Sequence, residues 1–589
     1  MLFVLVFLHS ALVQAGEKPQ HPIPVTLTVS GGGSLGSYQA GYLYYLLEIT
    51  KLNPDVWDIR AMTGTSAGSI NTALALFSLC DELEPDPLES IFYQTWSPMG
   101  IDALYKADQV GAVGILSRDA FRDAVQPMRE RFAAGWSTGC GTVWGTALTR
   151  LQPREVHLAD DFAVPQSLEH VIIDFRGRGP GQPVQVTPRL SPETGYSRVV
   201  LPLSDPGVEP FALFEEAVYA SAAVPLVFQP VSLPVCLIRP NEDPSDCAIE
   251  DASNVQFIDG GLFDNAPVRL ANQLATQGEA ELMFRFHLDA YLGRYPQPTA
   301  PPLQSDASAM VLLGSMMSGL VNVTSTNHLT ALMDEDPQAT DLLVLGRAAA
   351  PPMSIELSSF FGMFETSFRR FDFYLGMVSA HMDMLKRSQR FNELRHPEDQ
   401  PTAPADSWAP FLCMQAMLGE DPSVANACEA PSMRDLRPLL QVSIERLYAL
   451  CDVSNDAQLY PTCLPALAGV APPSVPGHTA PVGDGWRMRA EESTLEHLIR
   501  RLSYHGFLFV DSDANDISVR AAMKALRREM SEPLRELARQ NPEQRVMLNA
   551  LTRSLVRRTF PRPSRQDRLA EEAHPDSNRV SSVGQDAKE

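Results

Sequence analysis

Residues 59–77 read IRAMTGTSAGSINTALALF and carry the strongest structural signal in the chain. The apolar run over residues 58–64 is typical of a strand, and residues 67–79 are typical of a helix. Between them, GTSAG at residues 64–68 matches the G-x-S-x-G turn that lifts a serine hydroxyl above a sheet. The sequence therefore predicts a strand, a sharp turn at Ser66 and a helix whose N-terminus stabilises negative charge beside it. A glycine-lined turn with a capping serine is the alternative.

A glycine-rich segment precedes this turn. Residues 30–36 read SGGGSLG, after a predicted strand at 25–30 and before a predicted helix at 38–49. Glycines allow backbone N–H groups to approach an anion closely, and a helix N-terminus assists them. The segment lacks the Lys-Ser or Lys-Thr of a nucleotide-binding P-loop. Taken alone, it fits a tight strand-to-helix turn equally well.

A third motif places a carboxylate after a strand. Residues 257–267 read FIDGGLFDNAP, and the predicted strand at 255–258 delivers Asp259 to its carboxyl end. Such an aspartate can accept the proton of a serine nucleophile. An Asx turn that only stabilises the loop is the other interpretation.

Strands alternate with helices along the first half of the chain. Further strands are predicted at 171–175 and 281–287, and a further helix at 268–275, which favours an α/β layer fold over residues 25–295. Residues 296–303 read PQPTAPPL and form a predicted linker. A mostly helical region is predicted over 304–558. The tail at 561–589 is nearly free of apolar residues, so we expect disorder there.

Charge and the N-terminal segment limit the classes of function. Among the 589 residues, 47 are basic and 71 acidic, a net charge of −24 that disfavours nucleic-acid binding and simple docking to anionic membranes.

Residues 1–15 read MLFVLVFLHSALVQA and are typical of a secretory signal peptide. A buried N-terminal strand or helix is the alternative, and the run is too short to span a membrane. We expect export, with the periplasm, the outer-membrane surface and the medium left open.

The eight cysteines agree with export. Three pairs lie close in sequence, and two cysteines are left over: Cys236 with Cys247, Cys413 with Cys428, Cys451 with Cys463, and the remaining Cys80 and Cys140. In an oxidising compartment they are able to form four disulfides, although eight cysteines allow 105 connectivities. Buried free thiols are the alternative. None has the C-x-x-C spacing of a metal or redox site.

The three motifs, in this order, resemble those of the patatin-like phospholipase family. Residues 220–228, ASAAVPLVF, are similar to a fourth family segment, and residues 369–376, RRFDFYLG, give a weaker match. The resemblance covers about residues 25–295. It implies a three-layer α/β/α sandwich, here with a large, mostly helical C-terminal extension.

The resemblance also implies roles for individual residues. Ser66 would be the nucleophile and Asp259 its base, with an oxyanion hole formed by the backbone N–H groups of Gly32, Gly33 and Ala67. The remaining motif glycines are Gly31, Gly36, Gly64, Gly68, Gly260 and Gly261. The chain departs from the family at Leu35, where an Arg or Lys is usual. No metal or cofactor is implied. His287 is the candidate for a third triad member, against the alternative of a core histidine.

The predicted function is that of an exported lipid acyl hydrolase. It would cleave fatty-acyl ester bonds of phospholipids or related lipids through an acyl-enzyme, as a phospholipase A or lysophospholipase does. The expected partners are a lipid ester and, transiently, a membrane surface. The alternative is a binding or effector protein that keeps this scaffold and acts through residues 304–558.

Overall fold

The computed structural model describes most of the chain between residues 22 and 507. Single positions 531, 535 and 539 are also described, and the gaps are 105–115, 160–161, 191–196, 226, 276–282, 298–322, 325, 336–342, 356–360, 389–393, 419–421, 455–459 and 490–491. The predicted signal peptide, most of the predicted linker and the predicted disordered tail lie outside the described residues.

One mixed sheet organises the fold. Among the described residues it has ten strands, with the order β10-β9-β1-β2-β3-β8-β7-β6, and β4 and β5 branch from β3. The strands from β10 to β3 run parallel, whereas β8, β7 and β6 pair antiparallel. The strands are β1 Ile23–Val29, β2 Trp57–Gly64, β3 Val143–Ala159, β4 Phe162–Arg176, β5 Gln185–Arg189, β6 Arg198–Val200, β7 Val231–Ile238, β8 Ser253–Asp259, β9 Phe284–Gly293 and β10 Leu343–Ala348.

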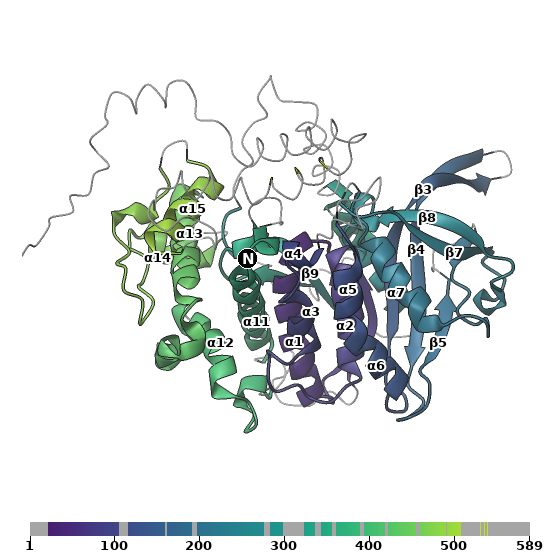
Figure 1. The fold of residues 1–589 in the computed structure, drawn as a ribbon, viewed down its shortest axis with the longest axis horizontal. Coiled ribbons are helices and arrows are strands. Elements are labelled where there is room, and N and C mark those ends of the chain that lie inside the picture. The colour runs from purple at the N-terminus through teal and green to yellow at the C-terminus, as the bar shows by residue number, and fades with distance from the viewer. Residues whose placement is uncertain are drawn as a thin grey trace, which may run out of the picture.

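Helices cover both faces of this sheet. Side chains alternate between the faces of a strand, so Val143 of β3 packs with Leu270 of α8, while the next residue, Trp144, joins the main core on the other face. That main core includes residues of α1, α2 and α7. The predicted three-layer α/β/α sandwich is confirmed (Figure 1). The helices of this part are α1 Gly36–Leu52, α2 Ala67–Leu79, α3 Ile91–Trp96, α4 Ile101–Leu104, α5 Asp119–Ala124, α6 Gln126–Ala134, α7 Pro210–Ser221 and α8 Val268–Ala275.

The C-terminal region is largely helical and contributes one strand to the sheet. Its helices are α11 Thr366–Ser388, α12 Ala405–Met417, α13 Arg437–Ser454, α14 Leu464–Leu467 and α15 Thr494–Tyr504. β10 lies in the region predicted to be mostly helical, yet it pairs parallel with β9. The sheet therefore reaches beyond residue 295. The sequence did not predict this strand, because a short apolar run fits a buried strand as well as a helix.

Helix α11 attaches this region to the first half of the chain. It lies beside α1 (Figure 1). A Cβ atom on Gly41 of α1 would overlap the Phe373 carbonyl oxygen, and one on Gly376 of α11 would overlap the Tyr38 carbonyl oxygen. The two glycines therefore allow the backbones to touch. This contact explains the RRFDFYLG segment at residues 369–376, which lies on α11.

All eight cysteines are paired. The disulfides are Cys80–Cys140, Cys236–Cys247, Cys413–Cys428 and Cys451–Cys463. The prediction of four disulfides is thus confirmed. Each bond lies within one half of the chain, so none joins the sheet to the C-terminal helices.

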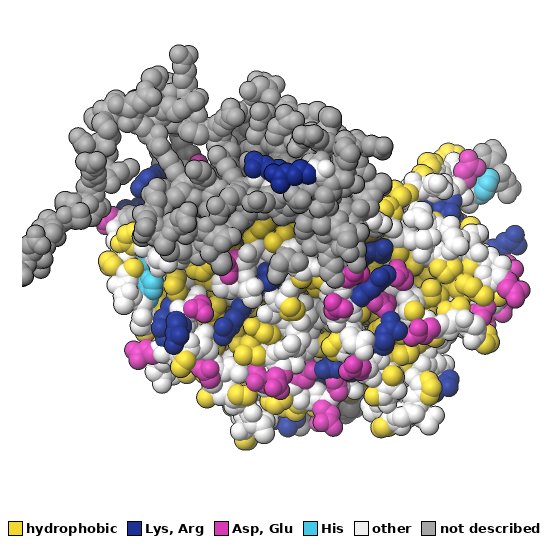
Figure 2. Space-filling view, in the orientation of Figure 1, with side chains coloured by type: hydrophobic (Ala, Val, Ile, Leu, Met, Phe, Trp, Pro, Cys, Tyr) yellow, Lys and Arg dark blue, Asp and Glu magenta, His cyan; other side chains and the backbone are white. Residues whose placement is uncertain are grey.

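None of the helices in the described part of the chain is long and apolar enough to span a bilayer. On the face drawn in Figure 2, acidic and basic side chains are interspersed, so the net negative charge does not form one continuous patch there.

Candidate active site

Ser66 lies in a strained turn between β2 and α2. Its φ is 57° and its ψ is −129°, and it is the one non-glycine residue with positive φ in the described part of the chain. A Cβ on Gly68 would overlap the Val29 carbonyl oxygen, and one on Gly64 would overlap the Gly68 carbonyl oxygen. Both flanking positions therefore require glycine. Non-glycine residues are held in such a conformation only where the surroundings impose it, and such positions cluster at active sites.

Asp259 ends β8 and is buried. Its side chain Oδ1 accepts a hydrogen bond of 2.7 Å from the Gly261 amide. Its own amide donates to the Ala223 carbonyl oxygen at 3.0 Å. A Cβ on Gly260 would overlap the Ala147 carbonyl oxygen of β3. These contacts fix both the strand end and the carboxylate, and the overlap with Ala147 explains why a glycine follows the aspartate.

The structure brings Ser66 and Asp259 together. Burial raises the pKa of Asp259 to about 6, and hydrogen bonding from the Ser66 hydroxyl and the Gly261 amide opposes the rise. Asp259 Oδ2 has no hydrogen-bond partner of ordinary geometry among the described residues. One carboxylate oxygen is thus engaged by the loop, and the other remains available to take a proton.

The glycine-rich segment lies against the same serine. A Cβ on Gly31 would lie 3.0 Å from Ser66 Cβ, and Gly33 has a φ of 57°. Among the described residues, the amides of Gly32, Gly33 and Ala67 donate no hydrogen bond. These three N–H groups therefore have no partner among the described residues, as donors to an oxyanion require. Leu35, the departure from the family pattern, is fully buried.

Two hydroxyls that the sequence analysis did not single out support the serine turn. The Ser66 amide donates to Ser221 Oγ at 3.1 Å. Ser221 Oγ lies 2.8 Å from Thr146 Oγ1, which donates to the Gly64 carbonyl oxygen at 2.9 Å. Ser221 and Ala223 both belong to the ASAAVPLVF segment, so this segment holds the serine turn and the aspartate strand at once. Its place in that motif could have pointed to Ser221, whereas nothing in the sequence points to Thr146.

The residues after the Asp-Gly-Gly turn also hold the loops together. The Gly31 amide donates to the Asn265 carbonyl oxygen at 3.2 Å, and Thr65 Oγ1 donates to the Asp264 carbonyl oxygen at 2.8 Å. The Asp264 carboxylate lies 3.0 Å from His170 Nε2 on β4. Asp264 and Asn265 therefore link the glycine-rich loop, the serine turn and the aspartate loop.

His287 does not join this constellation. It lies on β9, opposite Thr28 of β1 and Leu345 of β10, whereas Ser66 follows β2 and Asp259 ends β8. Burial lowers the pKa of His287, which favours the neutral imidazole of a core histidine. No contact between His287 and either residue is found in the described part of the chain.

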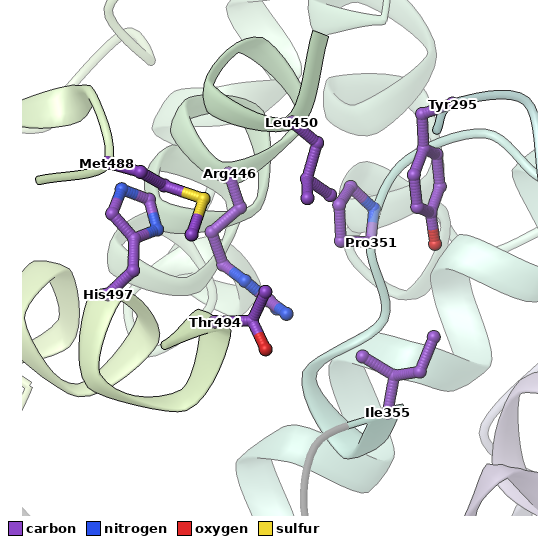
Figure 3. A pocket seen from close by; sticks show the side chains of 8 residues that line it. All are labelled: Tyr295, Pro351, Ile355, Arg446, Leu450, Met488, Thr494 and His497. Atoms are coloured by element: carbon purple, nitrogen blue, oxygen red, sulfur yellow. The ribbon is translucent and has the colours of Figure 1, made fainter. Parts of the chain in front are cut away.

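A small pocket opens elsewhere, among the C-terminal helices. Figure 3 shows its lining side chains, which come from the segments after β9 and β10, the helices α13 and α15 and the segment before α15: Tyr295, Pro351, Ile355, Arg446, Leu450, Met488, Thr494 and His497. None of them belongs to the Ser66–Asp259 site. This pocket therefore has no part in the chemistry considered below.

The comparison with family models agrees with the fold. The family model of patatin-like phospholipases matches residues 27–272. A solved structure, VipD from Legionella pneumophila, is 11% identical over 77% of this chain and 86% of its own, with a TM-score of 0.22. None of the curated proteins matches significantly. The family match spans the strand, turn and aspartate motifs that form the site, so the chain carries a patatin-like phospholipase domain, which supports lipid acyl hydrolase activity.

Proposed function

We propose that the chain is a serine acyl hydrolase in which Ser66 and Asp259 form a catalytic dyad. The observation that supports this most directly is the position of Ser66, in a strained turn beside a buried carboxylate with one uncommitted oxygen. Asp259 takes the hydroxyl proton while Ser66 Oγ attacks the carbonyl carbon of a fatty-acyl ester. The amides of Gly32, Gly33 and Ala67 stabilise the oxyanion that forms.

The second half of the reaction returns the enzyme to its starting state. The proton held by Asp259 passes to the departing alcohol or lysolipid oxygen as the ester bond breaks. Asp259 then removes a proton from water, whose oxygen attacks the acyl-enzyme. As the bond from the acyl carbon to Ser66 Oγ breaks, Asp259 returns that proton to Ser66 Oγ, and the fatty acid leaves. A carboxylate whose pKa is raised to about 6 is a stronger base than an ordinary aspartate, which makes the dyad workable without histidine.

Substitution of the nucleophile tests the proposal. Ser66→Ala is expected to lower hydrolysis of a phospholipid or lysophospholipid by about 10⁴-fold or more while the fold is retained. The matched control is Ser232→Ala, since Ser232 is an exposed serine on β7. Wild type and control should also react with a fluorophosphonate probe, and Ser66→Ala should not. Undiminished hydrolysis in Ser66→Ala would remove Ser66 from the mechanism.

The same experiment distinguishes between classes of lipid hydrolase, and it tests the alternative that the chain is a binding protein. Phospholipid, lysophospholipid and triacylglycerol substrates, compared on wild type and Ser66→Ala, distinguish phospholipase A, lysophospholipase and general lipase activity. A scaffold protein that acts only by binding through residues 304–558 would leave the probe unreacted at Ser66.

Export is a separate proposal. It is supported by the apolar start of the chain at residues 1–15 and by four disulfides in the fold. N-terminal sequencing of the mature protein should give a start near Gly16. A mature chain that retains Met1 would argue against cleavage.

A further inference from the structure

A cluster of metal-ligating side chains lies away from Ser66. His381, His396 and Glu398 each present a ligand atom, and these atoms lie within 4.8 Å of one another. The Tyr45 hydroxyl oxygen lies among them, 2.6 Å from His381 Nδ1 and 2.7 Å from His396 Nδ1. It is also 3.0 Å from each carboxylate oxygen of Glu398. Four side chains therefore bring two nitrogens and two kinds of oxygen together in one small region.

The four residues come from three parts of the chain. Tyr45 lies on α1, His381 on α11, and His396 and Glu398 at a short 3₁₀ turn, Pro397–Asp399. Asn53, just beyond α1, fixes the segment that carries the last two, through hydrogen bonds of 3.0 Å with the amide and the carbonyl group of Arg395. The segment is thus anchored independently of the cluster.

The surroundings are those of an enclosed site. Tyr45 is fully buried and stacks on Phe411, and His381 packs edge-on against the same ring. The side chains of His396 and Glu398 are 12% and 11% exposed. Charged and polar groups collected at such a position need partners to offset their desolvation. A bound cation satisfies a carboxylate and two imidazoles together.

We propose that Tyr45, His381, His396 and Glu398 form a structural site for a divalent transition metal, with Zn²⁺ as the best match. Zinc is bound by imidazole nitrogens and carboxylate oxygens, usually with four ligands in a tetrahedral arrangement. Here the Tyr45 oxygen, with its proton released, would be the fourth ligand. Bonds of about 2.1 Å place the ligand atoms about 3.4 Å apart. The separations in the cluster, 2.6 and 2.7 Å from Tyr45 to the imidazoles and 3.2 and 4.0 Å from Glu398 Oε1 to them, lie on both sides of that value.

Gln415 of α12 supplies an outer contact. Its side-chain nitrogen Nε2 lies 2.9 Å from His381 Nε2, the ring nitrogen that is left when Nδ1 binds a metal. An amide has nearly the same shape in both orientations, and with its oxygen toward His381 it accepts the Nε2–H hydrogen bond. Such outer contacts orient a metal-bound histidine.

The position of the site gives it a structural role. Tyr45 lies nine residues along α1 from Gly36, a distance of about 13 Å at 1.5 Å per residue. The glycine-rich loop and Ser66 are at the N-terminal end of that helix, so the metal does not approach the ester. It fastens α11 and the turn before α12 to α1, joining the C-terminal helices to the hydrolase domain (Figure 1).

The test uses purified full-length protein, loaded with ZnCl₂ and dialysed against metal-free buffer. Elemental analysis should find one zinc per chain in wild type and in the control His157→Gln, because His157 is an exposed histidine on β3. Glu398→Gln and Tyr45→Phe keep the shape of the cluster and should each lose the bound zinc. Gln415→Leu should weaken zinc binding by about 10- to 100-fold.

Two further readouts separate ligation from simple packing. Co²⁺ in place of zinc should give the visible absorption of a tetrahedral site in wild type and not in Glu398→Gln. Zinc should raise the thermal unfolding midpoint of wild type and His157→Gln, EDTA should reverse the rise, and Glu398→Gln should respond to neither. The alternative is a cluster without metal, in which both imidazoles donate hydrogen bonds to the Tyr45 oxygen. Zinc retention equal in all variants, or no retention and no EDTA effect in wild type, would overturn the metal site.

Discussion

The backbone of Ser66 is strained, and replacing Ser66 with glycine should relieve that strain and raise the stability of the fold. Its φ of 57° disfavours any residue with a Cβ atom. Ser66→Gly is therefore expected to stabilise the fold by about 1 kcal/mol relative to Ser66→Ala, although both variants lack the nucleophile. Thermal unfolding of the two variants side by side measures the difference. Equal midpoints would show that the turn is not strained.

The raised pKa of Asp259 predicts how hydrolysis depends on pH. Below about pH 6 the carboxyl group is protonated and cannot accept the Ser66 proton, so kcat/KM should rise with pH through an apparent pKa near 6 and then level off. Initial rates between pH 4 and 9 give the profile. A midpoint near the ordinary aspartate value of 3.8 would show that burial does not tune this base.

The same pKa predicts an effect on stability. Folding raises the pKa of Asp259 from 3.8 to about 6, so the folded state favours the protonated form, and burial of the charged form is unfavourable above pH 6. Asp259→Asn removes that charge. It should stabilise the protein by up to roughly 3 kcal/mol at pH 8, and the gain should shrink as the pH falls toward 4. Unfolding midpoints at the two pH values test this, and a gain independent of pH would contradict it.

At the proposed site, the sequence predicted the two turns that hold Ser66 and Asp259. Ser66 and Asp259 were predictable because glycines on either side are needed for their turns, and the turns themselves form a motif. Thr146 was not predictable, because a threonine on a strand has no local mark of its contact with Ser221. Tyr45 and Glu398 are 353 residues apart in sequence, and only the packing of α1 against the C-terminal region shows that they meet.

Among the secondary-structure elements, the contact between α1 and α11 gives the clearest prediction. Gly41→Ala places a methyl group where the Phe373 carbonyl oxygen lies, so it should push the helices apart and destabilise the fold by about 1–3 kcal/mol. Gly207→Ala is the matched control, because Gly207 is exposed and its nearest neighbour there is the Asp205 side chain at 3.2 Å. Thermal unfolding should show a lowered midpoint for Gly41→Ala alone.

Helices and strands were predictable to different degrees. The helices predicted at 67–79 and 268–275 coincide with α2 and α8, because each has a sharp start that the motif chemistry sets. The predicted strand at 171–175 is only the buried end of β4, which runs from Phe162 to Arg176. The outer part of β4 pairs with β3 as a long hairpin. Its side chains are exposed or half-buried, so it lacks the apolar run by which a buried strand is recognised.

For the molecule as a whole, the disulfides are expected to contribute unequally. Cys80–Cys140 spans 60 residues and Cys236–Cys247 spans 11. Because a longer closed loop restricts the unfolded chain more, removing the first bond by a double Cys→Ala substitution should cost about 4 kcal/mol, and removing the second somewhat less. Thermal unfolding of the two double variants compares them. The reverse order would show that native contacts, rather than loop closure, set their contributions.

Strand β10 has a practical meaning for anyone who shortens this protein. A fragment that stops at the proline-rich segment after β9 would keep every residue of the proposed dyad but would lose the strand that covers β9. The bare edge would offer its unpaired amides and carbonyls to another copy, which is a recognised route to aggregation. A soluble hydrolase fragment should therefore extend through α11, whose glycine contact with α1 closes the same side of the molecule.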